Sequence, residues 1–168
     1  IDAAVIATPN DTHHGIALDC LRAGLPVFLE KPVGLTLGEF DEIYEEGKRL
    51  GGIVQVGVEL RFSPLMQEIN RRLAQGEVGR LRQMWCKEYR PPLRPGEGGW
   101  RVSRRSGGAL LEKSVHHFDL FNWFAASRPT LVSAFGGTDV VYRESGVIDN
   151  AVVIVEYAND VRAALQLG

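Results

Sequence analysis

Cysteine, net charge and long apolar runs are all scarce in this sequence, and each scarcity excludes a class of protein. The two cysteines, Cys20 and Cys86, lie far apart without metal-type spacing, so we expect reduced thiols and neither a disulfide framework nor a zinc site. A formal net charge of -2 offers no basic field for nucleic acid. No apolar run approaches the roughly 20 residues that span a bilayer. We therefore expect a cytoplasmic globular protein that binds neither nucleic acid nor membrane.

An initiating methionine is also missing. Ile1 opens the chain, and the residues that follow it read at once as a strand. Because an α/β domain rarely begins without a turn or a cap, we interpret the chain as an interior piece of a longer protein. A signal upstream would not be visible here.

Strands and helices alternate over the first 60 residues. Apolar runs predict strands at 3–8, 26–30 and 53–57, and helical periodicity predicts helices at 12–23 and 37–50. The strands are apolar without alternation, which is typical of a parallel sheet covered by helices on both faces.

The pattern changes after a helix predicted at 64–74. A strand of mixed polarity is predicted at 80–90, followed by a loop rich in Pro, Gly and Arg at 91–106 and a helix at 108–126. Strands near 130–138, 149–157 and 161–167 follow, with a hairpin turn at 158–160. The sequence thus predicts an α/β first part, 1–60, and an α+β second part, 61–168, with an open, mainly antiparallel sheet.

Lys31 is the most informative single residue. It follows an apolar strand in the sequence Glu30-Lys31-Pro32, and open α/β sheets hold ligands at the carboxyl ends of their strands. A fixed ammonium there can stabilise negative charge on a reacting oxygen. A solvated lysine at the end of a strand is the simpler alternative.

A carboxylate and an imidazole follow in the helix predicted at 108–126. Glu112 and His116 are four residues apart, so an unbroken helix would place them on one face. His116 is a candidate general acid or base because imidazole titrates near neutral pH. Glu112 could orient that imidazole, contact a substrate hydroxyl or form an ordinary surface pair. His117 would point elsewhere, and adjacent His-His pairs do not suit one metal ion, so we expect no metal site.

Five motifs occur in one order along the chain. They are Ala7-Thr8-Pro9-Asn10 with His13, Glu30-Lys31-Pro32, Gly57-Val58-Glu59-Leu60-Arg61-Phe62-Ser63-Pro64, Gly76-Glu77-Val78-Gly79, and Gly107-Gly108 followed by Glu112, His116 and Asp119. In this order they resemble the glucose–fructose oxidoreductase/inositol dehydrogenase family (Gfo/Idh/MocA). The resemblance covers nearly the whole chain. It implies a dinucleotide-binding domain, an open-faced domain often used for oligomerisation, and sugar, polyol or cyclic-alcohol oxidation with NAD or NADP.

The resemblance also implies site residues. Those on the cofactor side are Thr8, Pro9, Asn10, His13, Glu30 and Lys31. Those on the substrate side are Arg61, Trp100, Arg101 and Asp119, beside the catalytic residues Lys31, His116 and Glu112. Arg61 could equally lock the two domains together, and Asp119 could orient His116.

Two departures from the family pattern stand out. The glycine-rich Gly-x-Gly-x-x-Gly turn that should precede the first strand is missing, so about half of the dinucleotide contacts are absent. Glu112 stands where Asp is common, with Lys113 and Ser114 where an apolar and a small residue are usual.

Three functions remain open from the sequence. The first is an NAD(P)-dependent dehydrogenase in the full-length protein, with this fragment inactive by itself. The second is an NAD-dependent glycoside hydrolase of the same family. The third is a non-catalytic fragment that forms homo-oligomers through an open sheet face bearing Leu131, Val152, Ile154 and Leu165.

Overall fold

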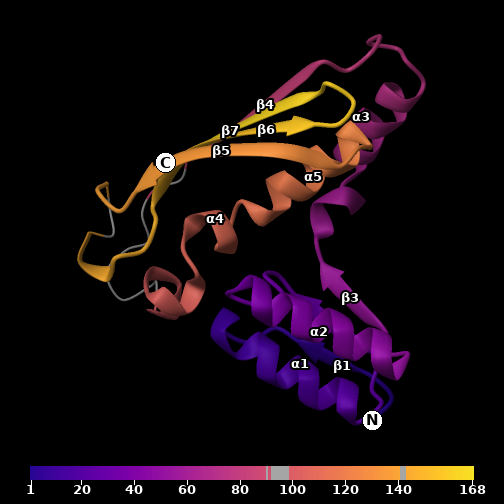
Figure 1. The fold of residues 1–168 in the computed structure, drawn as a ribbon, viewed down its shortest axis with the longest axis vertical. Coiled ribbons are helices and arrows are strands. Elements are labelled where there is room, and N and C mark those ends of the chain that lie inside the picture. The colour runs from indigo at the N-terminus through magenta and orange to yellow at the C-terminus, as the bar shows by residue number, and fades with distance from the viewer. Residues whose placement is uncertain (90, 92–98, 141–142) are drawn as a thin grey trace.

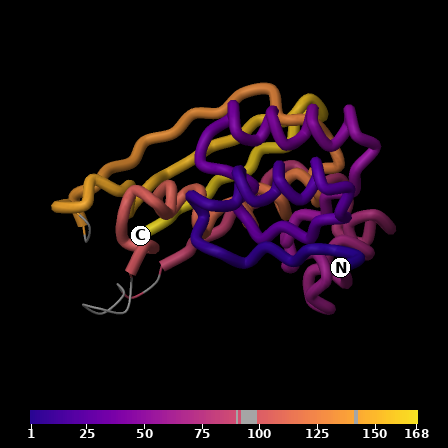
Figure 2. Tube along the Cα trace, turned by 90° about the horizontal axis from the view of Figure 1, so that it is seen from below, coloured from indigo at the N-terminus to yellow at the C-terminus, as the bar shows by residue number. Residues whose placement is uncertain are grey.

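Two layers built around separate sheets make up the structure, a computed structural model that describes residues 1–89, 91, 99–140 and 143–168. The N-terminus lies in the first layer and the C-terminus in the second, well apart in both views (Figures 1 and 2). The α/β class predicted from the sequence is confirmed.

The first layer is a three-stranded parallel sheet. Its strands β1 (Ala4–Ile6), β2 (Val27–Glu30) and β3 (Val54–Gly57) lie in that order, connected by α1 (His13–Arg22) and α2 (Leu37–Leu50). A short 3-10 turn, η1 (Asn10–Thr12), precedes α1. Thr36 caps α2 by accepting from the Glu39 N–H, and Gly51 ends it with a φ of 64° that favours glycine.

Helices cover this sheet on one face only, which corrects the expectation of two covered faces. Ile6, Val27 and Leu29 pack against α1 and α2 and are buried. Their neighbours in the strands point the other way, where Val5 is 76% exposed and Phe28 39%. Both helices return on the same side of the sheet, so the described residues leave the opposite face bare.

The link to the second layer begins at the end of β3. It consists of η2 (Glu59–Phe62) and α3 (Pro64–Ala74), and β4 (Gln83–Glu88) follows as the first strand of the second layer. The strand predicted at 80–90 is thus shorter, and residue 90 lies outside the described residues. Two 3-10 turns, η3 (Gly99–Val102) and η4 (Arg104–Ser106), occupy the end of the predicted loop, of which 92–98 are likewise not described.

The second layer is a four-stranded sheet in the order β4-β7-β6-β5, formed with β5 (Pro129–Gly137), β6 (Asn150–Tyr157) and β7 (Arg162–Leu167). β5–β6 and β6–β7 are antiparallel, while β4 lies parallel to β7. Another 3-10 turn, η5 (Arg143–Ser145), lies between β5 and β6. Asp160 turns the hairpin at the predicted place with a φ of 68°.

The helix predicted at 108–126 is broken into α4 (Ala109–Glu112) and α5 (Val115–Ala125). The Ala109 carbonyl accepts from both the Lys113 and the Ser114 N–H, at 2.9 and 3.2 Å, so the turn widens and helical bonding stops there. Glu112 and His116 therefore belong to different helices, and the expectation of one unbroken helix through both is wrong.

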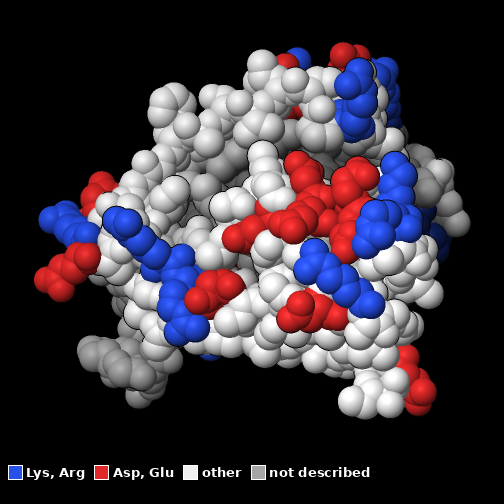
Figure 3. Space-filling model, turned by 60° about the horizontal axis from the view of Figure 1, so that its bottom comes forward, with Lys and Arg blue, Asp and Glu red and all other residues white. Residues whose placement is uncertain are grey.

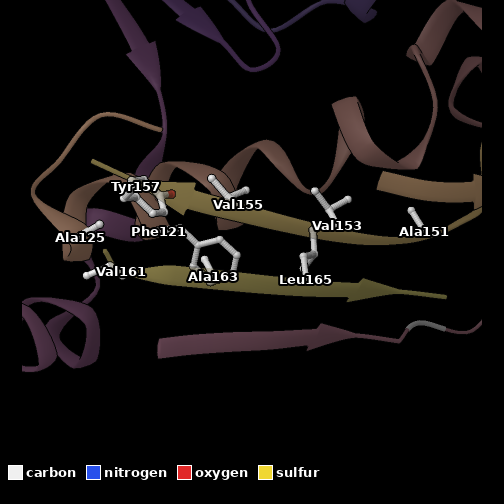
Figure 4. Close-up of a cluster of buried hydrophobic side chains, with 9 residues drawn as sticks. All are labelled: Phe121, Ala125, Ala151, Val153, Val155, Tyr157, Val161, Ala163 and Leu165. Carbon is white, nitrogen blue, oxygen red and sulfur yellow. The ribbon is translucent and has the colours of Figure 1, made fainter. Parts of the chain in front are cut away.

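The second core lies between α5 and the inner face of this sheet. Figure 4 shows Phe121 of α5 among inward side chains of β6 and β7, including Val155 and Leu165. Leu165 is fully buried, so its expected place on the open face is wrong.

The outward face of this sheet, called here the open face, is largely apolar. Pairing places Trp85, Ala164 and Ile154 in one row across three strands, with Phe135 beside Val152 in the next. Exposed side chains on this face include Trp85, Leu131, Phe135, Val152 and Ile154.

None of the helices among the described residues is long and apolar enough to cross a membrane.

Candidate active site

Lys31 lies where β2 ends and reaches across to the second layer. Its ammonium Nζ donates a hydrogen bond of 2.7 Å to the backbone carbonyl of Glu112. The same Nζ lies 3.8 Å from the Glu112 carboxylate, and the lysine side chain is only 15% exposed. The predicted rim cation is therefore held between two segments that lie 81 positions apart in the chain.

His116 stands in the first turn of α5, in a mostly buried position. Its Nε2 lies 3.5 Å from the carboxylate of Glu59, which follows the end of β3. Its Nδ1 is buried and has no hydrogen-bond partner among the described residues. The imidazole thus turns one nitrogen toward the partly exposed Glu59 and keeps the other within the protein.

Burial lowers the pKa of both candidate catalytic groups. Burial is the largest effect lowering the pKa of Lys31, opposed first by Glu112 and reinforced by the like charge of Lys113. Burial also lowers the pKa of His116, while Glu59 raises it and Lys31 lowers it further. The neutral, proton-accepting imidazole is therefore favoured near pH 7.

Glu112 is buried and faces cations on several sides. Its carboxylate lies 3.4 Å from the Lys113 ammonium and 3.8 Å from the Arg101 guanidinium, in addition to Lys31. Arg101 also lies over the ring of Trp100, 4.8 Å from its centroid. The structure therefore groups Glu112, Lys31 and Arg101 but ties His116 to Glu59.

Arg61 and Asp119 form a bidentate ion pair between η2 and α5. The guanidinium donates to both carboxylate oxygens at 2.6 Å. Arg61 also lies over Trp123, 5.7 Å from the ring centroid. Both oxygens of Asp119 face Arg61, so the pair fits a lock between the two layers better than an orienting carboxylate for His116.

The residues after β1 are largely occupied with internal contacts. His13 is buried, with Nδ1 2.7 Å from the Pro32 carbonyl and Nε2 2.9 Å from the Thr8 carbonyl. Asn10 donates from Nδ2 to the Ser106 carbonyl at 2.9 Å. The side chains of His13 and Asn10 thus brace the carboxyl end of the sheet. Pro9 accepts the Thr12 N–H through its carbonyl and adds no side-chain donor.

The remaining polar groups at this edge lie at the carboxyl ends of two neighbouring strands. The registers place the ends of β1 and β2 side by side, so Thr8 and the Glu30–Lys31 segment lie at the edge where open α/β sheets hold ligands. Glu30 accepts the Lys31 N–H at 3.2 Å, and an added Cβ at Gly57 would meet its carboxylate at 3.0 Å. This close backbone approach leaves the Glu30 carboxylate little room to move, beside a Lys31 ammonium that is itself held by the Glu112 carbonyl.

Two neighbours of the site were not predicted as site residues. Glu59 follows β3, and the rule that carboxyl ends of parallel strands gather at one edge was a usable signal for it. Lys113 lies at the site only because the helix breaks after Glu112. The residue pattern does not reveal that break. His14, next to His13, is partly exposed and pairs with Glu42 at 2.9 Å.

Charge elsewhere on the first layer is paired on the surface. Figure 3 shows acidic side chains gathered over the helices of this layer, with basic groups beside them. Glu46 of α2 accepts from Arg22 and Arg49, whose hydrogen bonds lower its pKa to about 2. Within the described residues, no group of three or more His, Cys, Asp or Glu is placed to hold a metal ion.

The chain belongs to the Gfo/Idh/MocA oxidoreductase family. Residues 1–58 match the family's NAD-binding Rossmann fold, and residues 66–168 match the Gfo/Idh/MocA C-terminal domain.

Inositol dehydrogenases are among its relatives. The chain is 30% identical over 173 residues to the scyllo-inositol 2-dehydrogenase (NAD(+)) of Bacillus subtilis, covering 98% of this chain and 48% of the relative. It is 28% identical to the myo-inositol 2-dehydrogenase of Thermotoga maritima, over 94% of this chain and 46% of that one. The crystal structure of myo-inositol 2-dehydrogenase from Lactobacillus plantarum superposes with a TM-score of 0.89 at 25% identity, covering 100% of this chain and 51% of that one. The chain thus spans about half the length of these relatives.

Proposed function

We propose that the full-length protein is an NAD(P)-dependent oxidoreductase that oxidises a secondary alcohol of a sugar, polyol or cyclic alcohol. The observation that supports this most is the meeting of Lys31 with the segment that carries Glu112 and His116. Membership of an oxidoreductase family with an NAD-binding fold, and inositol dehydrogenases among the relatives, agree with it.

In this proposal His116 is the general base. Burial keeps its imidazole neutral near pH 7, so it can take the hydroxyl proton of the alcohol. Lys31 donates a hydrogen bond to the same oxygen and stabilises its developing negative charge. A bound nicotinamide supplies the hydride acceptor. Thr8, Asn10 and the Glu30–Lys31 segment would border it, with Asn10 and His13 fixing the backbone there.

Arg61, Trp100 and Arg101 would border the substrate, with Asp119 holding Arg61 in place. We further propose that the first 60 residues are half of a dinucleotide-binding domain, and that a mononucleotide-binding half covers the bare face of the first sheet. The rest would form the substrate domain and pair as a homodimer through the open face.

The test is turnover of the full-length protein with NAD and NADP over a panel of sugars and inositols. Lys31→Met and His116→Gln should each lower kcat by about 100-fold or more, with cofactor affinity nearly unchanged. Lys31→Met removes the cation that would stabilise negative charge on the reacting oxygen, and His116→Gln removes the general base.

The matched controls lie on the helices of the first layer. Lys48→Met and His14→Gln remove the same groups from exposed or partly exposed positions and should leave kcat within about twofold. Equal activity of the wild type and both site variants would contradict the proposal. Sugar release without accumulation of reduced cofactor would favour a glycosidase instead. Residues 1–168 expressed by themselves should show no dehydrogenase activity.

A further inference from the structure

Three cations surround one carboxylate at the edge of the proposed site. The side chains of Lys31, Arg101 and Lys113 lie 3.8, 3.8 and 3.4 Å from the carboxylate of Glu112. Lys31 directly follows β2, Arg101 lies in η3, and Lys113 lies at the break between α4 and α5. Three separate segments therefore bring positive charge to one place.

Glu112 does not use the hydrogen-bonding capacity of these cations. Charge-assisted bonds between nitrogen and carboxylate oxygen are about 2.7–2.9 Å long, and all three separations exceed this. Lys31 instead donates its short hydrogen bond to the backbone carbonyl of Glu112. One carboxylate also balances only one of the three charges.

The other acids near Lys31 have contacts of their own. Glu59 faces His116, and Glu30 accepts the Lys31 backbone N–H beside Gly57. Among the ion pairs of the described residues, Lys113 and Arg101 thus face Glu112, a carboxylate that they share with Lys31. The Lys113 and Arg101 side chains are 37% and 51% exposed, so both can turn toward a ligand.

We propose that the substrate is a polyhydroxylated molecule bearing an anionic group, a carboxylate or a phosphate, bound by Lys113 and Arg101. This inference rests on the proposed function and specifies its substrate class. The anionic group would orient the molecule so that a hydroxyl lies toward Lys31 and His116. Lys113 would be a specificity-determining residue, with no part in proton transfer.

Equilibrium binding tests the inference independently of turnover. Isothermal titration calorimetry of the full-length protein would compare D-glucuronate and glucose 6-phosphate with D-glucose, the neutral counterpart. The wild type should bind at least one of the two anions about tenfold or more tightly than glucose, because hydrogen bonds to charged groups contribute roughly 1.5–3 kcal/mol. The preferred anion distinguishes carboxylate from phosphate.

Variants assign that preference to its residues. Lys113→Met keeps the length of the side chain but removes the charge, and should weaken binding of the preferred anion about tenfold or more while changing glucose binding less than about threefold. Arg101→Gln should act in the same direction. Lys48→Met, in the last turn of α2 at the opposite edge of the sheet, should change neither.

Equal affinity for glucose and both anions, or equal weakening of both kinds of ligand by Lys113→Met, would overturn the inference. Turnover of neutral sugars without anion preference would leave the proposed function standing and refute this one. Charge-dependent binding without any cofactor reduction would refute the proposed function but leave the binding of an anionic group by Lys113 and Arg101 standing.

Discussion

Burial lowers the pKa of two residues of the site, Lys31 and His116. Burial favours the uncharged form of each group, and the carboxylates of Glu112 and Glu59 oppose that effect. Glu59 is the acid that contacts the imidazole. The pH dependence of the proposed reaction should therefore respond to Glu59.

Glu59→Gln removes a charge that raises the pKa of His116, so that pKa should fall further. Charged groups facing the imidazole besides Glu59 are Lys31, His117 and Glu30, and they stay in place. Because the neutral imidazole is the base, the acid limb of the kcat/KM profile should move to lower pH. A profile of rate against pH measures the change. Glu45→Gln, at an exposed position of α2, should leave the acid limb unchanged. An acid limb that stays in place or moves to higher pH in Glu59→Gln would refute the role of Glu59.

Sequence reasoning at this scale works where a residue has a fixed place in a motif. Lys31 was expected at a strand end and is there. Glu59 and Lys113 were missed as site residues because their contacts depend on how two layers meet. Arg61 and Asp119 were both predicted as site residues. Their ion pair with each other is seen only in the structure.

At the scale of elements, His13 joins the start of α1 to the segments that follow β1 and β2. Both ring nitrogens lie within hydrogen-bonding distance of backbone carbonyls, and the side chain is buried. His13→Ala should lower the free energy of unfolding by about 2–4 kcal/mol, because it leaves a cavity and removes the imidazole N–H that a buried backbone carbonyl accepts. Urea unfolding of the full-length protein measures this loss.

His14 provides the adjacent control. Its imidazole makes one surface contact with Glu42, so His14→Ala should cost less than about 0.5 kcal/mol. Equal losses for the two alanine variants would show that His13 does not brace this edge.

The order of elements was predictable, but two of their details were not. Alternating strands and helices correctly predicted that the first sheet is parallel. Local periodicity does not say on which side both helices return, so the bare face was missed. Local periodicity also predicted one unbroken helix over 108–126. In the structure the helix stops at Lys113, where the Ala109 carbonyl accepts two N–H groups.

At the scale of the whole molecule, the open face is an apolar surface that no described element covers. Ile154 lies in the middle of this face, in one row with Ala164 and Trp85. If a homodimer forms there, Ile154→Lys should convert it to monomer, because two copies would place like charges in an apolar interface. Sedimentation velocity over a range of concentrations measures the result.

Ile16→Lys is the matched control for that experiment. Ile16 lies on α1 and is 37% exposed, against 46% for Ile154. The control should sediment like the wild type. A wild type that remains monomeric at high concentration would refute the dimer.

The contacts between the layers also have a thermodynamic consequence. Asn10, Asp11, Lys31 and Arg61 each bond to a residue between 105 and 119. Because these hydrogen bonds join the two layers, unfolding one layer must break contacts of the other. They include the hydrogen bond of Lys31, a residue of the proposed catalytic site. We therefore expect the layers to melt in a single calorimetric transition, and a ligand bound at Lys31 to raise the melting temperature of both.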